Sequence, residues 1–359
     1  MERHGNDGSE SGLLLLAEVA QLYYVRNLTQ QHIAERIGVS RSKVSRLLRE
    51  ARDRSIVEIR IRSPLTLAAD LQDALKTRLG LRECLVLAAP QADIDGSEGP
   101  DMIGRLSALG ARYLQENIAD GSVVGVSWSS TVYHVVSARY LQEKSNVTAV
   151  QLMGSLGGSI PELDGVSITA RLADALGAKA YYLHAPMLVA DAVVRDGLLR
   201  DPHIRKTLEV ARSTDTMVVL VGAIDRSSDQ YRTDYLDDAD LDYVRDQGAV
   251  GDICGSYFSY DGSPVRLRMN ERTIAIDFED MKGIPNRIGV SGRMHKVRPN
   301  IGAARTGLLN VLITDQDTAR EMLGILRSED ALQRPQATAG YKLRSAPLQG
   351  PLGSLPPKG

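Results

Sequence analysis

The spacing of apolar residues near the N-terminus follows the period of amphipathic helices. Three helices are predicted on this basis: Leu13–Arg26, Thr29–Arg36 and Ser40–Arg52. Val57, Ile59 and Ile61 then alternate with charged residues, which is the period-two pattern of a half-exposed strand. Residues 13–62 are therefore predicted to form a small, mainly helical domain that ends in a strand, or wing.

From residue 83 onward, short apolar runs are separated by helical segments. The runs predict seven strands: Cys84–Ala88, Val123–Val126, Val147–Leu152, Ala178–Leu183, Met217–Val221, Asn286–Val290 and Val311–Thr314. The segments between them predict helices at Met102–Ile118, Val132–Leu141, Ile168–Leu176, Ile204–Ala211 and Thr318–Leu326. Continuous apolar strands that alternate with helices indicate a mostly parallel sheet covered on both faces. We therefore predict a large, doubly wound α/β domain over residues 83–327.

The remaining segments carry weaker patterns. Residues 1–12 and 328–359 show no apolar periodicity and are predicted to be disordered. Residues 63–82 are predicted to form a linker that includes a helix. Leucines recur there at four-residue spacing, which suits either core packing or a contact between two copies: Leu67, Leu71, Leu75 and Leu79.

Charge is distributed unevenly along the chain. The net charge is −2, which taken alone argues against a nucleic-acid partner. Between Arg36 and Arg62, however, nine Lys and Arg residues stand against three Asp and Glu residues, a local excess of +6. A basic segment on an otherwise acidic chain is typical of a discrete DNA-binding module.

The second and third predicted helices have the features of a helix-turn-helix. Thr29 and Ser40 are suited to cap them, and Gly38 suits the tight turn between them. An inward apolar set would pack the helices together: Ile33, Ala34, Ile37, Val39, Val44, Leu47 and Leu48. The outward face would enter the major groove of double-stranded DNA, where arginine can pair with guanine; a solvated basic face on an ordinary helical hairpin is the alternative. The residues predicted to contact DNA are Thr29, Gln30, Ser40, Arg41, Ser42, Lys43, Ser45, Arg46 and Arg49.

Other chemistry is not indicated by the sequence. Cys84 and Cys254 match no metal-binding spacing and are interpreted as buried thiols in a reducing compartment. No apolar run approaches the roughly 18 residues that span a membrane, and no secretory signal is recognisable, so we expect a cytoplasmic protein without a membrane partner. No phosphate-binding loop, metal-spaced histidine pair or nucleophile elbow is present, so no cofactor, metal or catalytic residue is predicted.

A cluster of small hydroxyl residues marks a candidate anion site in the larger domain. Ser127, Ser129, Ser130 and Thr131 close a predicted strand and open a predicted helix, where side-chain and backbone donors and the helix dipole favour an anion. The same residues would also serve simply to cap the helix.

Five further positions are candidates on weaker grounds. Gly154 and Gly157 follow a strand and would allow either close approach to a ligand or a flexible turn. Asp252 could accept hydrogen bonds from sugar hydroxyls or cap a turn. Lys296 could meet a phosphate or carbonyl, or remain solvated. Asp315 could line the site or only cap the helix that follows it.

Four segments together resemble the SorC family of bacterial sugar-responsive regulators. The run from Leu28 to Leu48, LTQQHIAERIGVSRSKVSRLL, resembles the family's N-terminal DNA-reading module. Gly125–Val132, Gly248–Gly255 and Leu309–Asp315 are similar to its strand-end loop, its Gly-Asp element and its final strand and turn. The resemblance implies a C-terminal domain similar in fold to sugar-phosphate isomerases and aminosugar-phosphate deaminases. It also implies that this domain binds a phosphorylated sugar or polyol as effector, with Gly125 at the binding site. Finally, it implies assembly as a homodimer or homotetramer.

These observations predict a ligand-responsive transcriptional regulator rather than an enzyme. It would bind an inverted-repeat operator through the helix-turn-helix, sense a small-molecule effector through the larger domain, and control carbohydrate catabolism genes. Two alternatives stay open: an enzyme that acts on sugar phosphates and uses the small domain as a DNA tether, and a DNA-architectural protein without a ligand.

Overall fold

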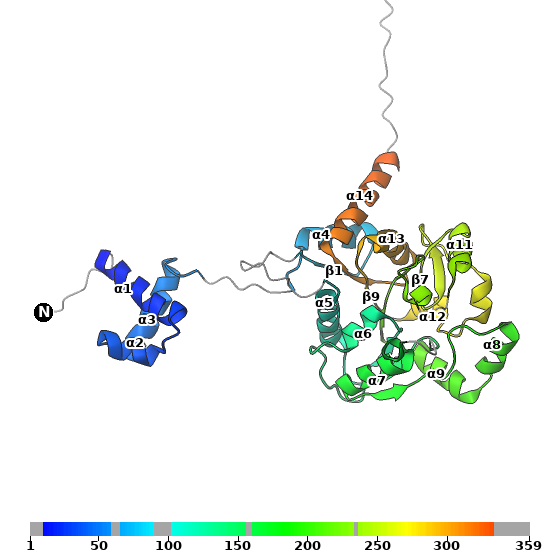
Figure 1. The fold of residues 1–359 in the computed structure, drawn as a ribbon, viewed down its shortest axis with the longest axis horizontal. Helices are drawn as coiled ribbons and strands as arrows, with labels where there is room; N and C mark the ends of the chain where they lie inside the picture. Colours follow the sequence, from blue (N-terminus) through cyan, green and yellow to red (C-terminus); the bar gives the residue numbers. More distant parts are fainter. Residues whose placement is uncertain (1–9, 59–64, 90–101, 156–159, 233–235, 334–359) are drawn as a thin grey trace, which may run out of the picture. The chain divides into compact units, whose positions relative to one another are not determined.

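The structure, a computed structural model, describes five stretches of the chain. They are residues 10–58, 65–89, 102–155, 160–232 and 236–333. These stretches fall into two compact units, one within Met1–Ser63 and the other within Pro64–Gly359 (Figure 1).

The smaller unit is built from helices. They are α1 (Glu10–Ala20), a π-helical turn (Gln21–Val25), α2 (Gln30–Ile37) and α3 (Arg41–Asp53). Leu16 and Val19 of α1 pack against Ile33 of α2 and Val44 and Leu47 of α3, and these residues form a core of their own. The apolar periodicity of the sequence thus located all three helices.

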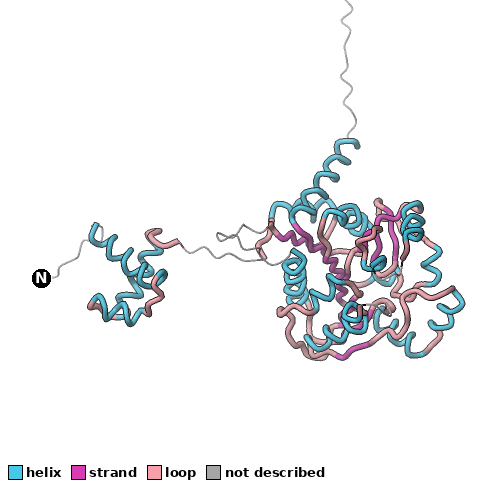
Figure 2. Tube along the Cα trace, in the orientation of Figure 1, coloured by secondary structure: helices cyan, strands magenta, loops and turns pink. Residues whose placement is uncertain are grey.

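Three predictions for the smaller unit, on the start of α1, on Val39 and on the wing, either differ from the structure or concern residues outside the described stretches. Helix α1 begins at Glu10, so residues 10–12, predicted to be disordered, form its first turn, because a first turn needs no apolar side chain. Val39 is 36% exposed rather than inward, since it follows the left-handed Gly38 that turns the chain away from the core. Val57 lies in a bend after α3, and Ile59 and Ile61 of the predicted wing lie outside the described residues; Figure 2 shows no strand in the described part of this unit.

A parallel sheet of seven strands forms the centre of the larger unit. In spatial order they are β1 (Glu83–Leu87), β10 (Val311–Asp315), β9 (Asn286–Val290), β5 (Thr216–Val219), β2 (Val123–Val126), β3 (Thr148–Gln151) and β4 (Lys179–Tyr181). All six pairings are parallel. Each strand coincides with one of the seven apolar runs, so the predicted fold class is confirmed.

The chain order of the strands creates a switch point between β2 and β5. From β2 the chain proceeds through β3 to β4 at one edge, and it then returns through β5, β9 and β10 toward the other edge. Because crossover connections are right-handed, this reversal places the helices on both faces of the sheet. Loops that leave neighbouring strands in opposite directions open a crevice at the carboxyl ends of those strands, where ligands of such folds bind.

Helices cover both faces of this sheet. The helices of the larger unit are α4 (Ala69–Leu79), α5 (Met102–Asn117), α6 (Ser130–Val136), α7 (Gly165–Leu176), α8 (Ala192–Leu199), α9 (Pro202–Arg212), α10 (Asp229–Arg232), α11 (Asp238–Asp246), α12 (Phe278–Gly283), α13 (Val297–Thr306) and α14 (Gln316–Gln333), of which α11 contacts β7 of the second, smaller sheet described below. Figure 1 shows α5, α6 and α7 together on one side and α4, α13 and α14 on the other. None of the described helices is long and apolar enough to cross a membrane.

Two helix ends differ from the prediction. Helix α6 stops at Val136 instead of Leu141, because Ala138 N donates to Val135 O in a tight turn. Helix α14 runs to Gln333, so residues 328–333 of the predicted disordered tail are helical. Polar contacts rather than apolar periodicity hold its outer turns: Glu329 accepts from Tyr260 and Arg305, and Asp330 pairs with Arg78 of α4. The remainder of that tail, residues 334–359, lies outside the described residues.

A second, antiparallel sheet was not predicted. It contains β6 (Gly222–Ala223), β7 (Ala249–Ile253) and β8 (Ser256–Ser259). The two-residue turn between β7 and β8 consists of Cys254 and Gly255, both with positive φ, as tight hairpins require. This sheet brings β7 next to the carboxyl end of β5, at the switch point of the large sheet.

Candidate DNA-contacting surface and ligand cavities

Two side chains start the helices of the predicted helix-turn-helix. Thr29 Oγ1 accepts a hydrogen bond from His32 N (3.3 Å), and Ser40 Oγ accepts one from Lys43 N (3.2 Å). Gly38 ends α2 with a φ of 67°, a left-handed conformation that costs glycine little. Each cap stabilises its helix by about 1 kcal/mol, so these side chains fix where α2 and α3 begin.

Helix α3 has one buried and one exposed face, as the sequence predicts. Val44, Leu47 and Leu48 are buried against the core. The side chains of the opposite face are exposed: Arg41, Ser42, Lys43, Ser45, Arg46 and Arg49. Thr29 and Ser40 are also exposed, whereas Gln30 is half-buried. A cationic face on the second helix of a helix-turn-helix is suited to a major groove, and contact of these residues with DNA stays a prediction.

Two adjoining cavities lie at the carboxyl ends of the central strands of the larger unit. The outer cavity has a volume of about 230 Å³ and is lined by Ile103, Ser130, Thr131, His134, Leu220, Ser227, Gly292, Arg293, His295 and Lys296. The inner cavity, about 30 Å³, is lined by Ser127, Trp128, Met153, Leu220, Gly222, Ser228, Gln230, Asp252, Cys254 and Lys296. Leu220 and Lys296 belong to both linings, so the two cavities meet at these side chains.

Asp252 places a buried carboxylate at the inner cavity. Its Oδ2 accepts hydrogen bonds from Gln230 Nε2 (3.0 Å) and Gly255 N (3.1 Å). Burial raises the pKa of Asp252 above its ordinary value, although these donors and the positive charge of Lys296 act against the shift. Its Oδ1 lies so close to Gly222 that a Cβ added there would be 1.8 Å away. Glycine at position 222 is therefore required by the carboxylate.

Lys296 is buried at the N-terminal end of α13, between the two cavities. Its Nζ donates a hydrogen bond to Val221 O (2.9 Å), which aims the ammonium group at the loop after β5. The sequence left a solvated lysine open as an alternative, and that alternative is wrong. Lys296 therefore presents a positive charge to any ligand that occupies both cavities.

The hydroxyl residues after β2 divide between lining and capping roles. Ser129 Oγ accepts from Val132 N (2.9 Å), so Ser129 caps α6. Ser130 and Thr131 line the outer cavity, and Ser127 lines the inner one. The buried Ser127 Oγ has no hydrogen-bond partner among the described residues, which leaves it available to a ligand.

Two of the predicted ligand positions are glycines that pack closely against neighbouring segments of the chain. Neither cavity is lined by Gly125 or Gly154: a Cβ on Gly125 would approach Leu152 to 2.6 Å, and one on Gly154 would approach the Pro186 backbone to 2.5 Å. Gly154 O also accepts from Trp128 Nε1 (3.0 Å). Gly157 lies outside the described residues.

Asp315 also lies outside both linings. Its Oδ1 accepts from Thr318 N (2.9 Å) and so caps α14, and its Oδ2 accepts from Arg293 N (2.8 Å). Capping, one of the two roles left open by the sequence, is therefore its role in the structure. In addition, Asp315 holds the loop that carries Arg293 and His295 to the outer cavity.

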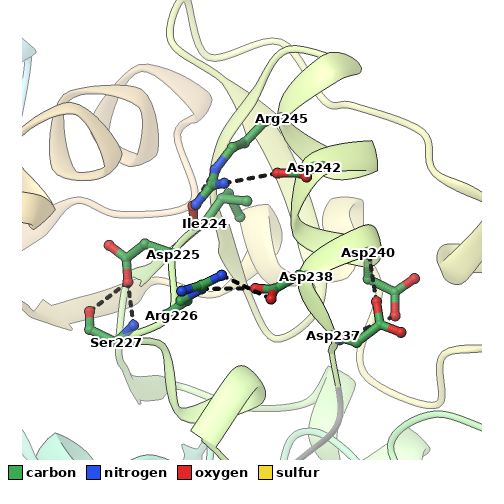
Figure 3. A network of polar contacts seen from close by, with 9 residues as sticks. All are labelled: Ile224, Asp225, Arg226, Ser227, Asp237, Asp238, Asp240, Asp242 and Arg245. Carbon is green, nitrogen blue, oxygen red and sulfur yellow. Dashed lines mark hydrogen bonds and ion pairs between the residues drawn. The ribbon is translucent and has the colours of Figure 1, made fainter.

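The segment that follows β6 supplies lining residues that the sequence did not suggest. Ser227 lines the outer cavity, while Ser228 and Gln230 line the inner one. Figure 3 shows how this segment is held: Arg226 makes a bidentate ion pair with Asp238 of α11, with distances of 2.8 and 2.9 Å. Arg245 Nε donates to Ile224 O (2.9 Å), and Asp225 accepts from the backbone and hydroxyl of Ser227. Arg226 and Asp238 are 12 positions apart, and Ile224 and Arg245 are 21 apart, so no local pattern could have revealed these two contacts.

The electrostatic character of the outer cavity is positive. Arg293, His295 and Lys296 contribute cationic or protonatable groups, and no carboxylate occurs among its described lining residues. Burial, together with Lys296 and Arg293, lowers the pKa of His295, while Asp225 opposes the shift. Among the described residues, no three His, Cys, Asp or Glu side chains are grouped to hold a metal ion.

Comparison with known proteins assigns a family model to each unit. A sugar-binding domain model matches residues 63–324, and a model of sigma-70 region 4 matches residues 17–54. The deoxyribonucleoside regulator of Bacillus subtilis (strain 168) is 32% identical over 312 residues, which cover 87% of this chain and 98% of the relative. The sorbitol operon regulator of Klebsiella pneumoniae is 26% identical over 311 residues, with 86% and 97% covered. The crystal structure of full-length SorC from Klebsiella pneumoniae matches with a TM-score of 0.64 at 25% identity, over 88% of this chain and all of that chain (100%).

Proposed function

Because the chain belongs to the SorC family of sugar-responsive transcriptional regulators, we propose that its larger unit binds a phosphorylated sugar or polyol across the two adjoining cavities. The protein is a transcriptional regulator that joins a helix-turn-helix to a sugar-binding domain, as the sequence predicts. The identity of the effector and of the operator belongs to the proposal.

The observation that carries the proposal is the chemical difference between the two cavities. The outer cavity presents hydroxyls from Ser130, Thr131 and Ser227 together with the cationic groups of Arg293 and Lys296. Cationic groups and hydroxyl donors bind phosphate, since charge-assisted hydrogen bonds to an anion are about twice as strong as neutral ones. We place the phosphate of the effector in this cavity.

The inner cavity suits one hydroxyl-bearing end of the effector's carbon chain. The Asp252 carboxylate accepts hydrogen bonds from ligand hydroxyls, and the unpartnered Ser127 Oγ can donate or accept. Trp128, Met153 and Cys254 supply apolar contact for carbon atoms. At about 30 Å³ the cavity admits little more than one polar group of a ligand, so a short sugar or polyol fits better than a bulky one.

The named relatives support this class of effector. The Bacillus subtilis relative is named for deoxyribonucleosides, which are sugar derivatives, and the Klebsiella pneumoniae relative for an operon of sorbitol, which is a polyol. By analogy, the genes controlled here are those of carbohydrate catabolism. We propose no cofactor besides the effector.

We further propose that the protein acts as a homodimer or homotetramer on an inverted-repeat operator. Two identical readers related by a two-fold axis match two half-sites about one helical turn apart. Arg46 and Arg49, exposed on α3, would contact bases or phosphates. We infer a cytoplasmic location, as binding to genomic DNA requires.

We propose that the larger unit senses its ligand without transforming it. The relatives are named as regulators, and the Asp252 carboxylate and the Lys296 ammonium are both engaged by neighbouring groups. Turnover of a phosphorylated sugar by the purified protein, abolished by Asp252→Ala, would instead establish an enzyme with a DNA tether.

The decisive experiment is recovery of fragmented genomic DNA by the purified full-length protein at near-physiological salt, followed by sequencing. Fragments that share an inverted repeat would support the operator proposal, and the neighbouring genes would nominate the effector. Diffuse recovery that disappears as salt rises would mean backbone contact alone and would contradict it. A thermal-shift screen of phosphorylated and free sugars and polyols, each tested for release or recruitment at the recovered site, then identifies the ligand; absence of any shift would contradict the effector proposal.

A further inference from the structure

A third cavity adjoins the inner one at the turn between β7 and β8. It has a volume of about 290 Å³, and its lining includes Arg195 of α8, Tyr257 of β8, Asn270, Ile276 and Phe278. Cys254 lines both this cavity and the inner one, in the same way that Leu220 and Lys296 line both the inner and the outer cavity. No described residue lines both the outer and the third cavity. The three cavities therefore follow one another in the order outer, inner and third.

The wall between the inner and the third cavity is made partly of backbone and partly of one side chain. Met153, which lines the inner cavity, forms an antiparallel β-bridge with Ala275, which lines the third. A hydrogen bond from Ile276 N to Leu152 O (2.8 Å) holds the adjoining residues together. Substitution cannot remove backbone of this kind. The Cys254 side chain, a free thiol, is the part of the wall that a substitution can take away.

Cys254 is held firmly in place. It is 4% exposed and occupies the first position of the two-residue turn, with a φ of 51°. The next residue, Gly255, donates its N–H to Asp252 Oδ2 (3.1 Å) and accepts a hydrogen bond from Asn270 Nδ2 at its carbonyl oxygen (2.9 Å). Glycine adopts a positive φ at the least cost, yet a residue with a side chain stands here. A fixed side chain at a position whose backbone favours glycine indicates that the side chain itself has a role.

The third cavity offers the space that the inner cavity lacks. An effector with its phosphate in the outer cavity passes Lys296 into the inner cavity, and its far end then faces Cys254. The inner cavity, at about 30 Å³, takes little more than one polar group, whereas the third cavity has roughly ten times that volume. Space for a longer carbon chain is therefore present beyond Cys254, and the thiol closes it off.

We propose that Cys254 limits the length of the effector, because its side chain closes the inner cavity against the third. The protein then accepts a short phosphorylated sugar or polyol and rejects longer members of the same series. This inference rests on the effector site proposed above and adds the residue that gives the site its selectivity for length. Without this side chain, the additional carbons would lie against Ile276 and Phe278, and their hydroxyls would meet Ser256.

Titration of the full-length protein with linear polyol monophosphates tests this limit. The series lengthens by one hydroxylated carbon at each step: the terminal monophosphates of glycerol, erythritol, ribitol and sorbitol, and then the seven-carbon and eight-carbon members. Isothermal titration calorimetry gives the Kd of each compound. For the wild type, we expect Kd to rise at least about tenfold at the first compound whose chain reaches Cys254, since one surplus carbon in a closed pocket costs about 10- to 200-fold in affinity.

Cys254→Gly should move this length limit by at least one carbon. Glycine adopts the positive φ of the turn without strain, so the variant should fold, which its melting temperature verifies. Cys254→Ala, which removes only the sulfur atom, is a second opened variant and should shift the limit in the same direction. Cys254→Ser is the matched control: its side chain has the same shape, so the limit should stay where it is. Because Cys254 also lies against the ligand, the quantity compared is the compound at which Kd rises, not the Kd of any one compound.

A double variant tests whether the longer ligand enters the third cavity. Ala275 lines that cavity beside the wall, so a leucine side chain at this position would occupy the opened space. In the Cys254→Gly background, Ala275→Leu should restore the wild-type length limit. Ala275→Leu alone should leave that limit unchanged, because the wild-type effector does not reach the third cavity.

An identical length limit in the wild type, Cys254→Gly and Cys254→Ala would overturn the inference and leave the effector site standing. A wild type that binds every member of the series equally well would overturn it too, as would a shifted limit that Ala275→Leu does not restore. Absence of binding by every compound, to the wild type and to the opened variants, would instead contradict the proposed class of effector, and the length limit would fall with it. Failure of the proposed function is thus distinguishable from failure of this inference alone.

Discussion

Substitution of Gly222 by alanine is the sharpest probe of the inner cavity. The added methyl carbon would lie 1.8 Å from Asp252 Oδ1 and 2.9 Å from its Cγ, far inside any permitted contact. The carboxylate would have to move by more than 1 Å, roughly the gap to ordinary van der Waals contact, or β6 would have to shift away from β7. Either movement disturbs the acceptor that we assign to ligand hydroxyls.

The cost can be estimated from the contacts. Overpacking alone costs about 1–3 kcal/mol. Each hydrogen bond to a charged group contributes about 1.5–3 kcal/mol, and Asp252 Oδ2 accepts two, from Gln230 and Gly255. A partial shift of the two-residue strand β6 would relieve part of the clash. We therefore expect Gly222→Ala to lower the stability of the larger unit by about 3 kcal/mol, which corresponds to roughly 6–12 °C in melting temperature.

Scanning calorimetry of the full-length protein measures this effect. The transition of the smaller unit serves as an internal reference, because its core contains no residue of the larger unit. Effector affinity should fall as well, since the methyl group and the displaced carboxylate fill a cavity of about 30 Å³. Gly324→Ala is the matched control: it lies within α14 with no atom near its Cβ position, so it should stabilise by about 0.5–1 kcal/mol. Wild-type melting and wild-type effector affinity in Gly222→Ala would refute the placement of Asp252.

Four further substitutions test the two units. Arg46→Ala should cost about 1–3 kcal/mol of operator affinity and relax base preference at one position; uniform weakening across operator variants would make it a phosphate contact. Ser40→Ala removes the cap of α3 and should lower the stability of the smaller unit by about 0.5–2 kcal/mol in the same calorimetric scan. Thr131→Val should weaken effector binding and leave ligand-free DNA affinity unchanged in titrations of each; full effector affinity would remove Thr131 from the site. Burial raises the pKa of Asp252 in the folded state. The stability that this group contributes is therefore fully present below its unfolded-state pKa and is lost as pH rises through its folded-state pKa. Over that pH interval Asp252→Asn should lose less stability than the wild type, and parallel stability–pH profiles of the two proteins would contradict this.

The sequence predicted the large sheet well because each of its strands contains or adjoins a short apolar run. The second sheet escaped prediction because β7 is interrupted by Gly251 and Asp252, and β8 begins and ends with serine. Its strands are stabilised by a cluster that includes Leu236, Leu241 and Met269 from outside the sheet, which no local pattern reports.

The candidate site was predicted in part, for a topological reason. Ser127, Thr131 and Lys296 were singled out in segments that follow predicted strands, and the parallel topology brings the carboxyl ends of those strands together. The sequence could not distinguish a strand-end residue whose side chain reaches the cavity from one that turns away, as Asp315 does. Nor could it reveal Gln230, which reaches the inner cavity only through the fold of the second sheet.

The separation of the hydrophobic cores makes the protein modular. The core of the smaller unit consists of residues between Leu16 and Ala51, and the clusters of the larger unit begin at Leu65. Among the described residues, no side chain belongs to both cores, so each unit can change its specificity without repacking the core of the other. A cut at the boundary between Ser63 and Pro64 is thus a natural splice point for joining this effector domain to a different DNA-reading domain, as the construction of a metabolite biosensor requires.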